Sequence, residues 1–103
     1  MNKKLLYSPE ALQDLDDIGE YISEELSSPK AANKILSEIF STIDLLSNNP
    51  LMRANLSALT NIVSDYKYLV VKKYLVFYRI KDSAIYIDRI LYSKRNYLSI
   101  LLA

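Results

Sequence analysis

The chain has 103 residues, enough for one domain over residues 1–103 with a single hydrophobic core. It contains no cysteine and no histidine, which excludes disulfides and thiol chemistry and removes the commonest general base and metal ligand. The apolar runs are far shorter than the roughly 20 residues that cross a bilayer, and the N-terminus lacks the apolar core of a signal peptide. We therefore expect a cytoplasmic protein with no metal site and no membrane partner.

The net charge of +1 hides a large difference between the two halves. Residues 1–50 carry nine acidic residues against four lysines, a balance of −5, whereas residues 51–103 carry nine basic residues against three acidic ones, a balance of +6. A basic half is typical of proteins that bind nucleic acid or an acidic protein segment. A merely solvated charged face has the same composition, so charge alone leaves both interpretations open.

A short strand over residues 3–7 and two amphipathic helices are predicted in the N-terminal half. Each helix begins at a Ser-Pro pair, Ser8-Pro9 or Ser28-Pro29, in which serine suits the N-cap and proline the first helical position. The second helix is expected to end at Asn48-Asn49-Pro50, which gives an αα-hairpin. The predicted apolar stripes are Leu12, Leu15, Ile18 or Gly19, Ile22 and Leu26 in the first helix, and Ala32, Ile35, Leu36, Ile39, Phe40, Ile43 and Leu46 in the second.

The C-terminal half has the composition of strands. Residues 51–65 show no clear pattern and are predicted as a loop with room for one helical turn. Segments 66–71, 74–80 and 84–92 are rich in Val, Ile, Tyr and Phe and are separated by gaps short enough for hairpins. Lys72-Lys73 is poor two-residue turn chemistry because neither residue favours positive φ, so either the loop is longer or these lysines are kept for another reason. Residues 94–102 are expected to form a short helix or an extended tail.

The element order β-α-α-β-β-β predicts an α+β fold. We expect an antiparallel sheet, with the first strand at one edge, backed on one face by the N-terminal helical hairpin. Strict alternation along the last strand places Arg89 on the same face as Ile85, Ile87 and Leu91. The second face of the sheet is expected to be bare and therefore open to a partner.

Five segments in this order resemble the RelE/ParE superfamily of toxins from type II toxin–antitoxin systems, which includes plasmid stabilization proteins. The segments are Tyr7-Ser8-Pro9-Glu10-Ala11 with the following Leu12-Gln13-Asp14-Leu15, Ser28-Pro29-Lys30-Ala31-Ala32, Asn49-Pro50, Tyr74-Leu75-Val76-Phe77-Tyr78-Arg79-Ile80, and Arg89-Ile90-Leu91-Tyr92-Ser93-Lys94-Arg95-Asn96-Tyr97. The resemblance covers nearly the whole chain. It implies a growth-inhibiting toxin whose active surface is covered by a cognate antitoxin, although a second copy of the chain, in a homodimer, would also satisfy an exposed sheet face.

Members of the superfamily act by one of two mechanisms, and the resemblance implies that this chain uses one or the other. RelE-like members cut mRNA in the ribosomal A site, whereas ParE-like members are not nucleases and poison DNA gyrase. Leu75 stands where RelE-like nucleases usually carry an arginine, and Tyr92 stands where many relatives have a histidine. The ParE-like mechanism is therefore slightly favoured, and a RelE-like ribosome-dependent mRNA endoribonuclease is the alternative.

Candidate site residues follow from the chemistry of each alternative. A metal-free RNA cut requires proton transfer and stabilisation of charge on the phosphate, and without histidine the candidates are cations and tyrosines. If the chain is a nuclease, the predicted catalytic residues are Arg79, Lys94, Arg95 and Tyr97. The predicted target-binding residues are Lys72, Lys73, Arg89 and Tyr92. No cofactor is indicated, because the single glycine, Gly19, is incompatible with glycine-rich nucleotide loops.

Each of these residues also has a purely structural interpretation. Strand arginines commonly pair with a neighbour such as Asp88, tyrosine is a good strand former, and lysines at hairpin tips are commonly just solvated. The acidic residues of the first helix are expected to be solvated as well. A third interpretation is an inactive binding module that shares the fold, because fold alone does not dictate function.

Overall fold

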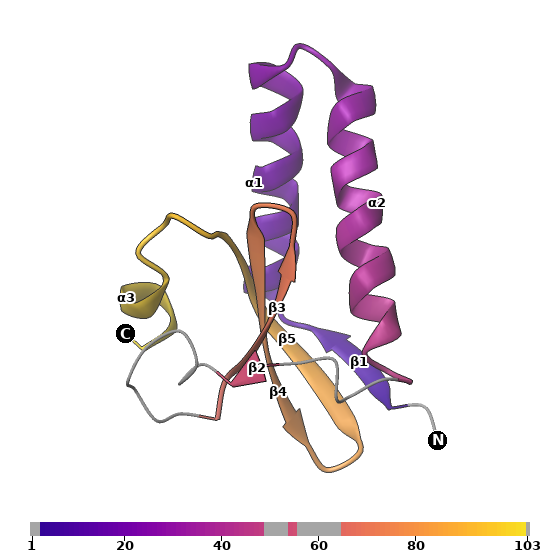
Figure 1. Cartoon of the computed structure of the whole chain (residues 1–103), viewed down its shortest axis with the longest axis vertical. Coiled ribbons are helices and arrows are strands. Elements are labelled where there is room, and N and C mark those ends of the chain that lie inside the picture. Colours follow the sequence, from indigo (N-terminus) through magenta and orange to yellow (C-terminus); the bar gives the residue numbers. More distant parts are fainter. Residues whose placement is uncertain (1–2, 49–53, 56–64, 103) are drawn as a thin grey trace.

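The computed structural model describes residues 3–48, 54–55 and 65–102 and shows a helical hairpin packed against a mixed sheet (Figure 1). The elements are β1 (Lys4–Tyr7), α1 (Pro9–Glu25), α2 (Pro29–Leu45), β2 (Ala54–Asn55), β3 (Lys67–Val71), β4 (Tyr74–Lys81), β5 (Ala84–Tyr92) and α3 (Tyr97–Leu101). The predicted α+β class is confirmed, and the predicted order β-α-α-β-β-β is found with one further strand, β2, where a loop was expected. The expected helix end at Asn49-Pro50 and most of the expected loop at 51–65 lie outside the described residues.

Both helices begin at the predicted Ser-Pro pairs. The Ser8 hydroxyl oxygen accepts a hydrogen bond from the Ala11 N–H at 2.9 Å, and Ser28 does the same for Ala31 at 3.2 Å. The Ser8 hydroxyl also donates to the carbonyl of Asp88 at 2.8 Å, so the cap ties the start of α1 to β5. A Cβ at Gly19 would lie only 3.1 Å from Cδ1 of Leu36, which shows how closely α1 and α2 approach.

The sheet has the strand order β1-β5-β4-β3-β2. β3, β4 and β5 form the predicted antiparallel meander, and β1 lies at the edge beside β5. β1 runs parallel to β5, from Lys4 opposite Ala84 to Tyr7 opposite Ile87, so the expectation of a wholly antiparallel sheet was wrong. The hairpin returns the chain to the start of β1, where the Lys3 N–H donates to the Ser47 carbonyl at 3.1 Å. Because β3, β4 and β5 alternate in direction, β3 and β5 both run in the direction of β1.

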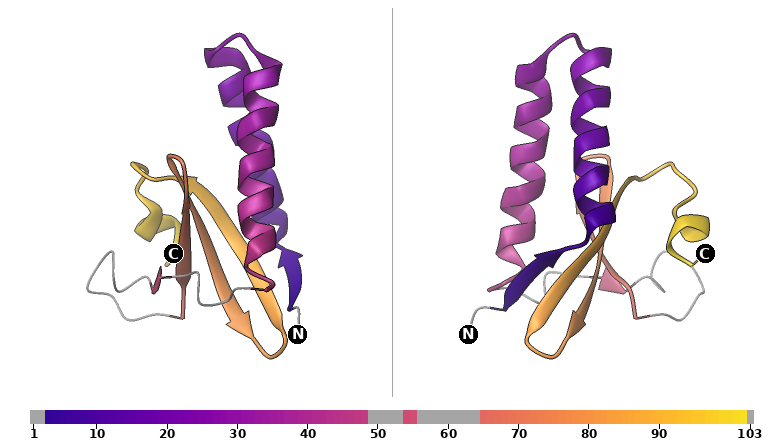
Figure 2. Two further views of the ribbon diagram at one scale, coloured as in Figure 1. Left: turned by 45° about the vertical axis from the view of Figure 1, so that its right-hand side comes forward. Right: turned by 180° about the vertical axis from the view of Figure 1, so that it is seen from behind.

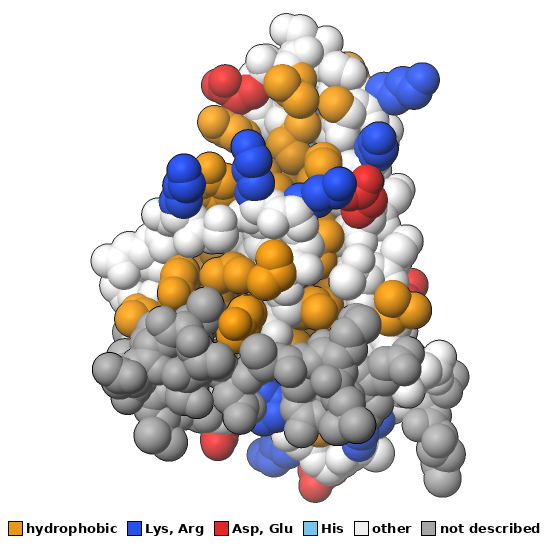
Figure 3. All heavy atoms as spheres, viewed as in Figure 1, with side chains coloured by type: hydrophobic (Ala, Val, Ile, Leu, Met, Phe, Trp, Pro, Cys, Tyr) orange, Lys and Arg blue, Asp and Glu red, His pale blue; other side chains and the backbone are white. Residues whose placement is uncertain are grey.

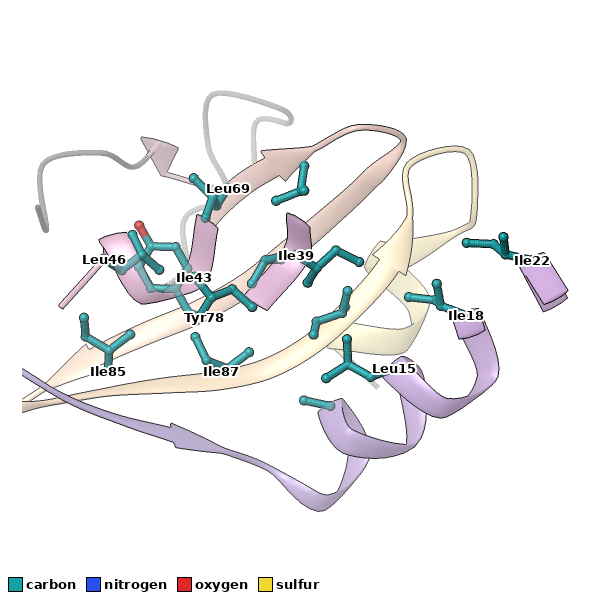
Figure 4. Close-up of a cluster of buried hydrophobic side chains, with 14 of the residues drawn as sticks. Leu15, Ile18, Ile22, Ile39, Ile43, Leu46, Leu69, Tyr78, Ile85 and Ile87 are labelled. Atoms are coloured by element: carbon teal, nitrogen blue, oxygen red, sulfur yellow. The ribbon is translucent and has the colours of Figure 1, made fainter. Parts of the chain in front are cut away.

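The main core lies between the hairpin and one face of the sheet (Figure 4). Ile39, Ile43, Tyr78, Ile85 and Ile87 are completely buried there. The predicted stripes are correct in their centres and wrong at three positions, because Leu12, Leu26 and Phe40 are 49%, 63% and 39% exposed. In α1 the buried positions belong to Ala11, Asp14, Leu15, Ile18 and Ile22, so the buried face is rotated and includes a carboxylate that was expected to be solvated.

A β-bulge in β5 changes which side chains face the helices. Phe77 pairs with Arg89 but Tyr78 pairs with Ile87, which leaves Asp88 as an extra residue in β5. Beyond the bulge, Ile90 joins Ile85 and Ile87 in the main core, and Leu91 packs in a second cluster. The expectation that Leu91 shares a face with Ile85 and Ile87 was therefore wrong. Side chains alternate between the two faces of a strand, so one extra residue moves every later side chain to the opposite face.

The second face of the sheet is covered by the C-terminal segment, so the expectation of a bare face was also wrong. Leu75, Phe77 and Leu91 on this face are 5%, 0% and 1% exposed, and Tyr97 and Leu98 of α3 pack against them. The hairpin and α3 lie on opposite sides of the sheet (Figure 2). Within the described residues no helix is long and apolar enough to cross a membrane.

Candidate interaction site at the open end of the sheet

A groove of about 730 Å³ lies between α1 and the end of the sheet where the β3–β4 turn meets the end of β5. Its apolar lining comes from Ile18, Tyr21, Ile22, Leu26, Ile35, Tyr74, Ile90, Leu91 and Tyr92. Its charged lining is divided, with Asp14, Asp17 and Glu25 on the α1 side and Lys72, Lys73 and Arg95 on the sheet side. We call this the open-end groove. Figure 3 shows hydrophobic side chains along the hairpin next to a row of Lys and Arg side chains.

A buried ion pair fixes one wall of the open-end groove. Arg89 donates from Nε and Nη2 to the two carboxylate oxygens of Asp14, both at 2.8 Å, and the backbone N–H of Ile90 donates to Asp14 at 2.9 Å. The Asp14 side chain is 6% exposed and that of Arg89 is 25% exposed. The hydrogen bonds to Asp14 raise the pKa of Arg89 above its usual value, although burial acts in the opposite direction. This bidentate clamp sets the position of α1 relative to β5.

Two tyrosines form the aromatic part of the sheet-side wall. Tyr74 and Tyr92 are opposite each other on β4 and β5, and their rings meet edge to face at 6.0 Å. Burial raises the pKa of Tyr74, with smaller contributions from Tyr21 and Tyr92. Tyr74 therefore stays protonated and neutral near pH 7, which makes it a poor general base.

The structure brings together four of the eight residues singled out in the sequence. Lys72, Lys73, Tyr92 and Arg95 all line the open-end groove. Arg89 does not line it but holds Asp14, which does. Lys94 is exposed and adjacent to Arg95 in the chain.

Arg79 and Tyr97 lie elsewhere. Arg79 donates from Nε to Asp88 at 2.6 Å and lies 6.0 Å from the centre of the Tyr66 ring. It is five residues along β4 from Tyr74, roughly 16 Å at about 3.3 Å per residue. Tyr97 is in α3, where its ring packs on Phe77 at 5.4 Å. The four residues predicted for a nuclease are thus not gathered around one point.

Asp14 and Tyr21 are two groove residues that the sequence reasoning did not select. Asp14 was assigned to the solvated side of the first helix, yet it is four residues before Ile18 and three after Ala11, so it shares their side of α1. Arg89, a charged residue in a strand rich in Ile and Leu, was the available signal that an acidic partner lies nearby, but the adjacent Asp88 was the obvious candidate. Tyr21 is 62% exposed, and nothing in the sequence pattern distinguishes it from an ordinary surface tyrosine. In the described part of the chain, no cluster of three or more Asp or Glu residues is suited to a metal ion.

Comparison with solved structures identifies the class of the fold. A chain of the chromosomal ParDE toxin–antitoxin system from P. aeruginosa superposes with a TM-score of 0.75 at 22% identity, over 89% of this chain and 97% of that chain. A chain of the RelBE2 toxin–antitoxin complex from Mycobacterium tuberculosis gives 0.60 at 18% identity, over 89% and 99%. A chain of the DinJ–YafQ toxin–antitoxin complex from E. coli gives 0.58 at 14% identity, over 89% and 93%.

The model of the family described as "ParE toxin of type II toxin-antitoxin system, parDE" matches residues 5–97, so the chain belongs to this family. It is thus a type II toxin–antitoxin toxin of the RelE/ParE superfamily, as the resemblance implied. No curated protein sequence matches the chain significantly.

Proposed function

We propose that this chain inhibits growth as a ParE-like poison of DNA gyrase and that it does not cut RNA. The observation that carries the proposal is the separation of Arg79 from Lys94 and Arg95. A nuclease must place a phosphate-binding cation and proton-transfer groups within hydrogen-bond reach of one phosphodiester. Here the Arg79 guanidinium is held by Asp88, about five residues along the strand from the groove that Arg95 lines.

Two further positions argue against nuclease chemistry. Leu75 stands where RelE-like nucleases usually carry an arginine, and it is buried beneath α3. This position therefore supplies neither a cation nor an accessible side chain to a substrate. Tyr97 packs on Phe77, and this contact restricts its ring. The match to the ParE family model supports the same conclusion.

We expect the open-end groove to receive part of a cognate antitoxin. An apolar groove with exposed Tyr21 and Leu26 on one wall suits the apolar face of an amphipathic helix. The opposite charges of its two sides would fix the orientation of such a helix. The similar solved structures are toxin–antitoxin complexes, which supports a protein partner of this kind.

The target is tested with the purified chain in two parallel assays. In the first, the chain is incubated with gyrase, ATP and supercoiled plasmid, and DNA breaks are counted after protease treatment. In the second, it is incubated with translating ribosomes, and the mRNA is mapped for cuts. We expect gyrase-dependent breaks and intact mRNA. Cuts that occur only with ribosomes would establish the RelE-like alternative, and continued growth on expression of soluble chain would establish an inert module.

The antitoxin site is tested with two exposed leucines of the helical hairpin. Leu26 and Leu45 are 63% and 50% exposed, but only Leu26 lines the open-end groove. We expect Leu26→Arg to weaken capture of the protein encoded beside this chain by at least tenfold, while Leu45→Arg leaves capture unchanged. Equal losses in both variants, or none in Leu26→Arg, would place the antitoxin elsewhere.

A further inference from the structure

Five exposed cations from different parts of the chain line three adjoining grooves. Lys72, Lys73 and Arg95 line the open-end groove, and Lys72 also lines a second groove of about 650 Å³ that it shares with Lys34. Lys34 in turn lines a third groove, of about 510 Å³, together with Lys30. We call these five residues the cationic belt. The space-filling view shows a row of Lys and Arg side chains across the face where the β3–β4 turn passes in front of the hairpin (Figure 3).

The belt combines residues from both halves of the sequence. Lys30 and Lys34 belong to the half with a net charge of −5. The distribution of charge along the sequence therefore does not predict this grouping of cations in the folded chain. The two lysines are one turn apart on α2, about 6 Å along its axis. The next residue of that series, Glu38, pairs with Lys72 at 3.6 Å, and this contact joins the helix to the β3–β4 turn.

Lys72 has a backbone conformation that is unfavourable for a lysine. Lys72 has a φ of +56° at the first position of the two-residue turn between Val71 and Tyr74. This conformation is unfavourable for a residue with a Cβ, whereas glycine or asparagine adopts it more readily. The other two-residue turn places Asp82, a better tolerated residue, at the same φ. The exposed ion pair with Glu38 is too weak to account for the lysine.

The groove linings favour one class of partner. Lysines and small polar side chains such as Asn33, Ser37 and Ser41 line the second and third grooves, and Glu38, Val70 and Val71 complete the lining of the second. Lysines together with hydroxyl and amide groups are what proteins use to contact the sugar–phosphate backbone. An acidic helix would need a broad apolar seat, and single-stranded RNA would be expected to stack on aromatic rings. Among the described residues that line these two grooves, the large apolar side chains are Val70 and Val71 of β3, and none of the lining residues is aromatic.

We propose that the cationic belt binds the phosphate backbone of duplex DNA without reading its sequence. The belt would hold the toxin on one strand of the duplex through its five cations, each releasing condensed counterions. The choice of DNA over an RNA duplex rests on the proposed function, because gyrase holds DNA. The binding itself requires neither gyrase nor antitoxin.

The test is the salt dependence of binding of the full chain to a labelled DNA duplex of about 24 base pairs and arbitrary sequence. Fluorescence anisotropy between about 20 and 200 mM salt gives the slope of log K against log salt. Five phosphate contacts predict a slope of about −4.5, and Lys30→Gln/Lys34→Gln should reduce its magnitude by about 2, at about 0.9 per contact. Binding should weaken equally for duplexes of different sequence.

The matched control removes two lysines at the other end of the sheet. Lys4 and Lys81 are exposed, and both are paired in register with Ala84. Lys4→Gln/Lys81→Gln changes the net charge by the same amount and should leave the slope unchanged. Equal losses in the two double variants would overturn the belt as a site. So would the absence of wild-type binding, or tighter binding of single-stranded DNA or of an acidic peptide. Because the assay contains no gyrase, its failure and the failure of the gyrase proposal are separate results.

Discussion

Asp14 is the residue on which the relation between α1 and the last strand depends. Its carboxylate is satisfied by three donors, two from Arg89 and one from the Ile90 backbone. A buried charge is tolerated when its partners compensate for the loss of water, and removing one partner leaves the other uncompensated. The clamp is therefore more important for the shape of the groove than a surface ion pair would be.

We expect Asp14→Ala to lower the free energy of unfolding by about 3 kcal/mol, because it strands the Arg89 guanidinium and the Ile90 N–H. Asp16→Ala, on the exposed side of the same helix, should change it by no more than about 0.5 kcal/mol. Denaturant unfolding followed by far-UV circular dichroism measures both. Similar values for the two variants would show that the clamp contributes little.

Tyr7 gives the protein a stability change at alkaline pH. Burial raises the pKa of Tyr7 from 10.0 to about 12, and the charge of Asp44 adds to this. Because the folded pKa lies above the unfolded one, the contribution of Tyr7 to stability is fully present below pH 10 and is lost as the pH rises towards 12. The free energy of unfolding of Tyr7→Phe should therefore fall less steeply over this range than that of the wild type. Parallel slopes would contradict the assignment.

In the β3–β4 turn, the residue that would be best for stability differs from the residue that the proposed DNA binding requires. Lys72→Gly should raise the free energy of unfolding by about 0.5–1 kcal/mol, because it relieves the positive φ, and should weaken DNA binding by removing a cation of the belt. Lys73 is not among the residues with positive φ, so Lys73→Gly should destabilise by a similar amount. Thermal unfolding of the pair distinguishes them. A stability loss in Lys72→Gly would contradict the argument.

The elements differ in how far the sequence determines them. The helix starts were predictable because Ser8-Pro9 and Ser28-Pro29 satisfy the first turn locally. The limits of β5, Ala84–Tyr92, follow from its composition and agree with the prediction. The bulge at Asp88 was not predictable, because it depends on pairing with β4 and no turn residue marks it. The covering of Phe77 by α3 depends in the same way on contacts between elements.

At the scale of the whole molecule, the sequence indicated the layers correctly and the accessible surface incorrectly. A hairpin of two amphipathic helices must bury its apolar face on the sheet, which is a property of composition. Which part of the sheet remains accessible depends on where the last few residues fold, and α3 closes the face that was expected to be open. The candidate site therefore moved from the face of the sheet to its end, where Lys72, Lys73, Tyr92 and Arg95 meet.

The pairing of the first strand with the last also determines at what stage of its synthesis the chain can fold. β1 hydrogen-bonds along β5, and the Ser8–Asp88 and Asp14–Arg89 contacts span 80 and 75 residues of chain. Contacts of such long range form late, because the intervening chain must first be closed into a loop. A nascent chain consequently cannot assemble the groove until β5 has left the ribosome, because Tyr92 and Arg95 line it. A fragment that stops before β5 should therefore lack the strand against which β1 and α1 pack.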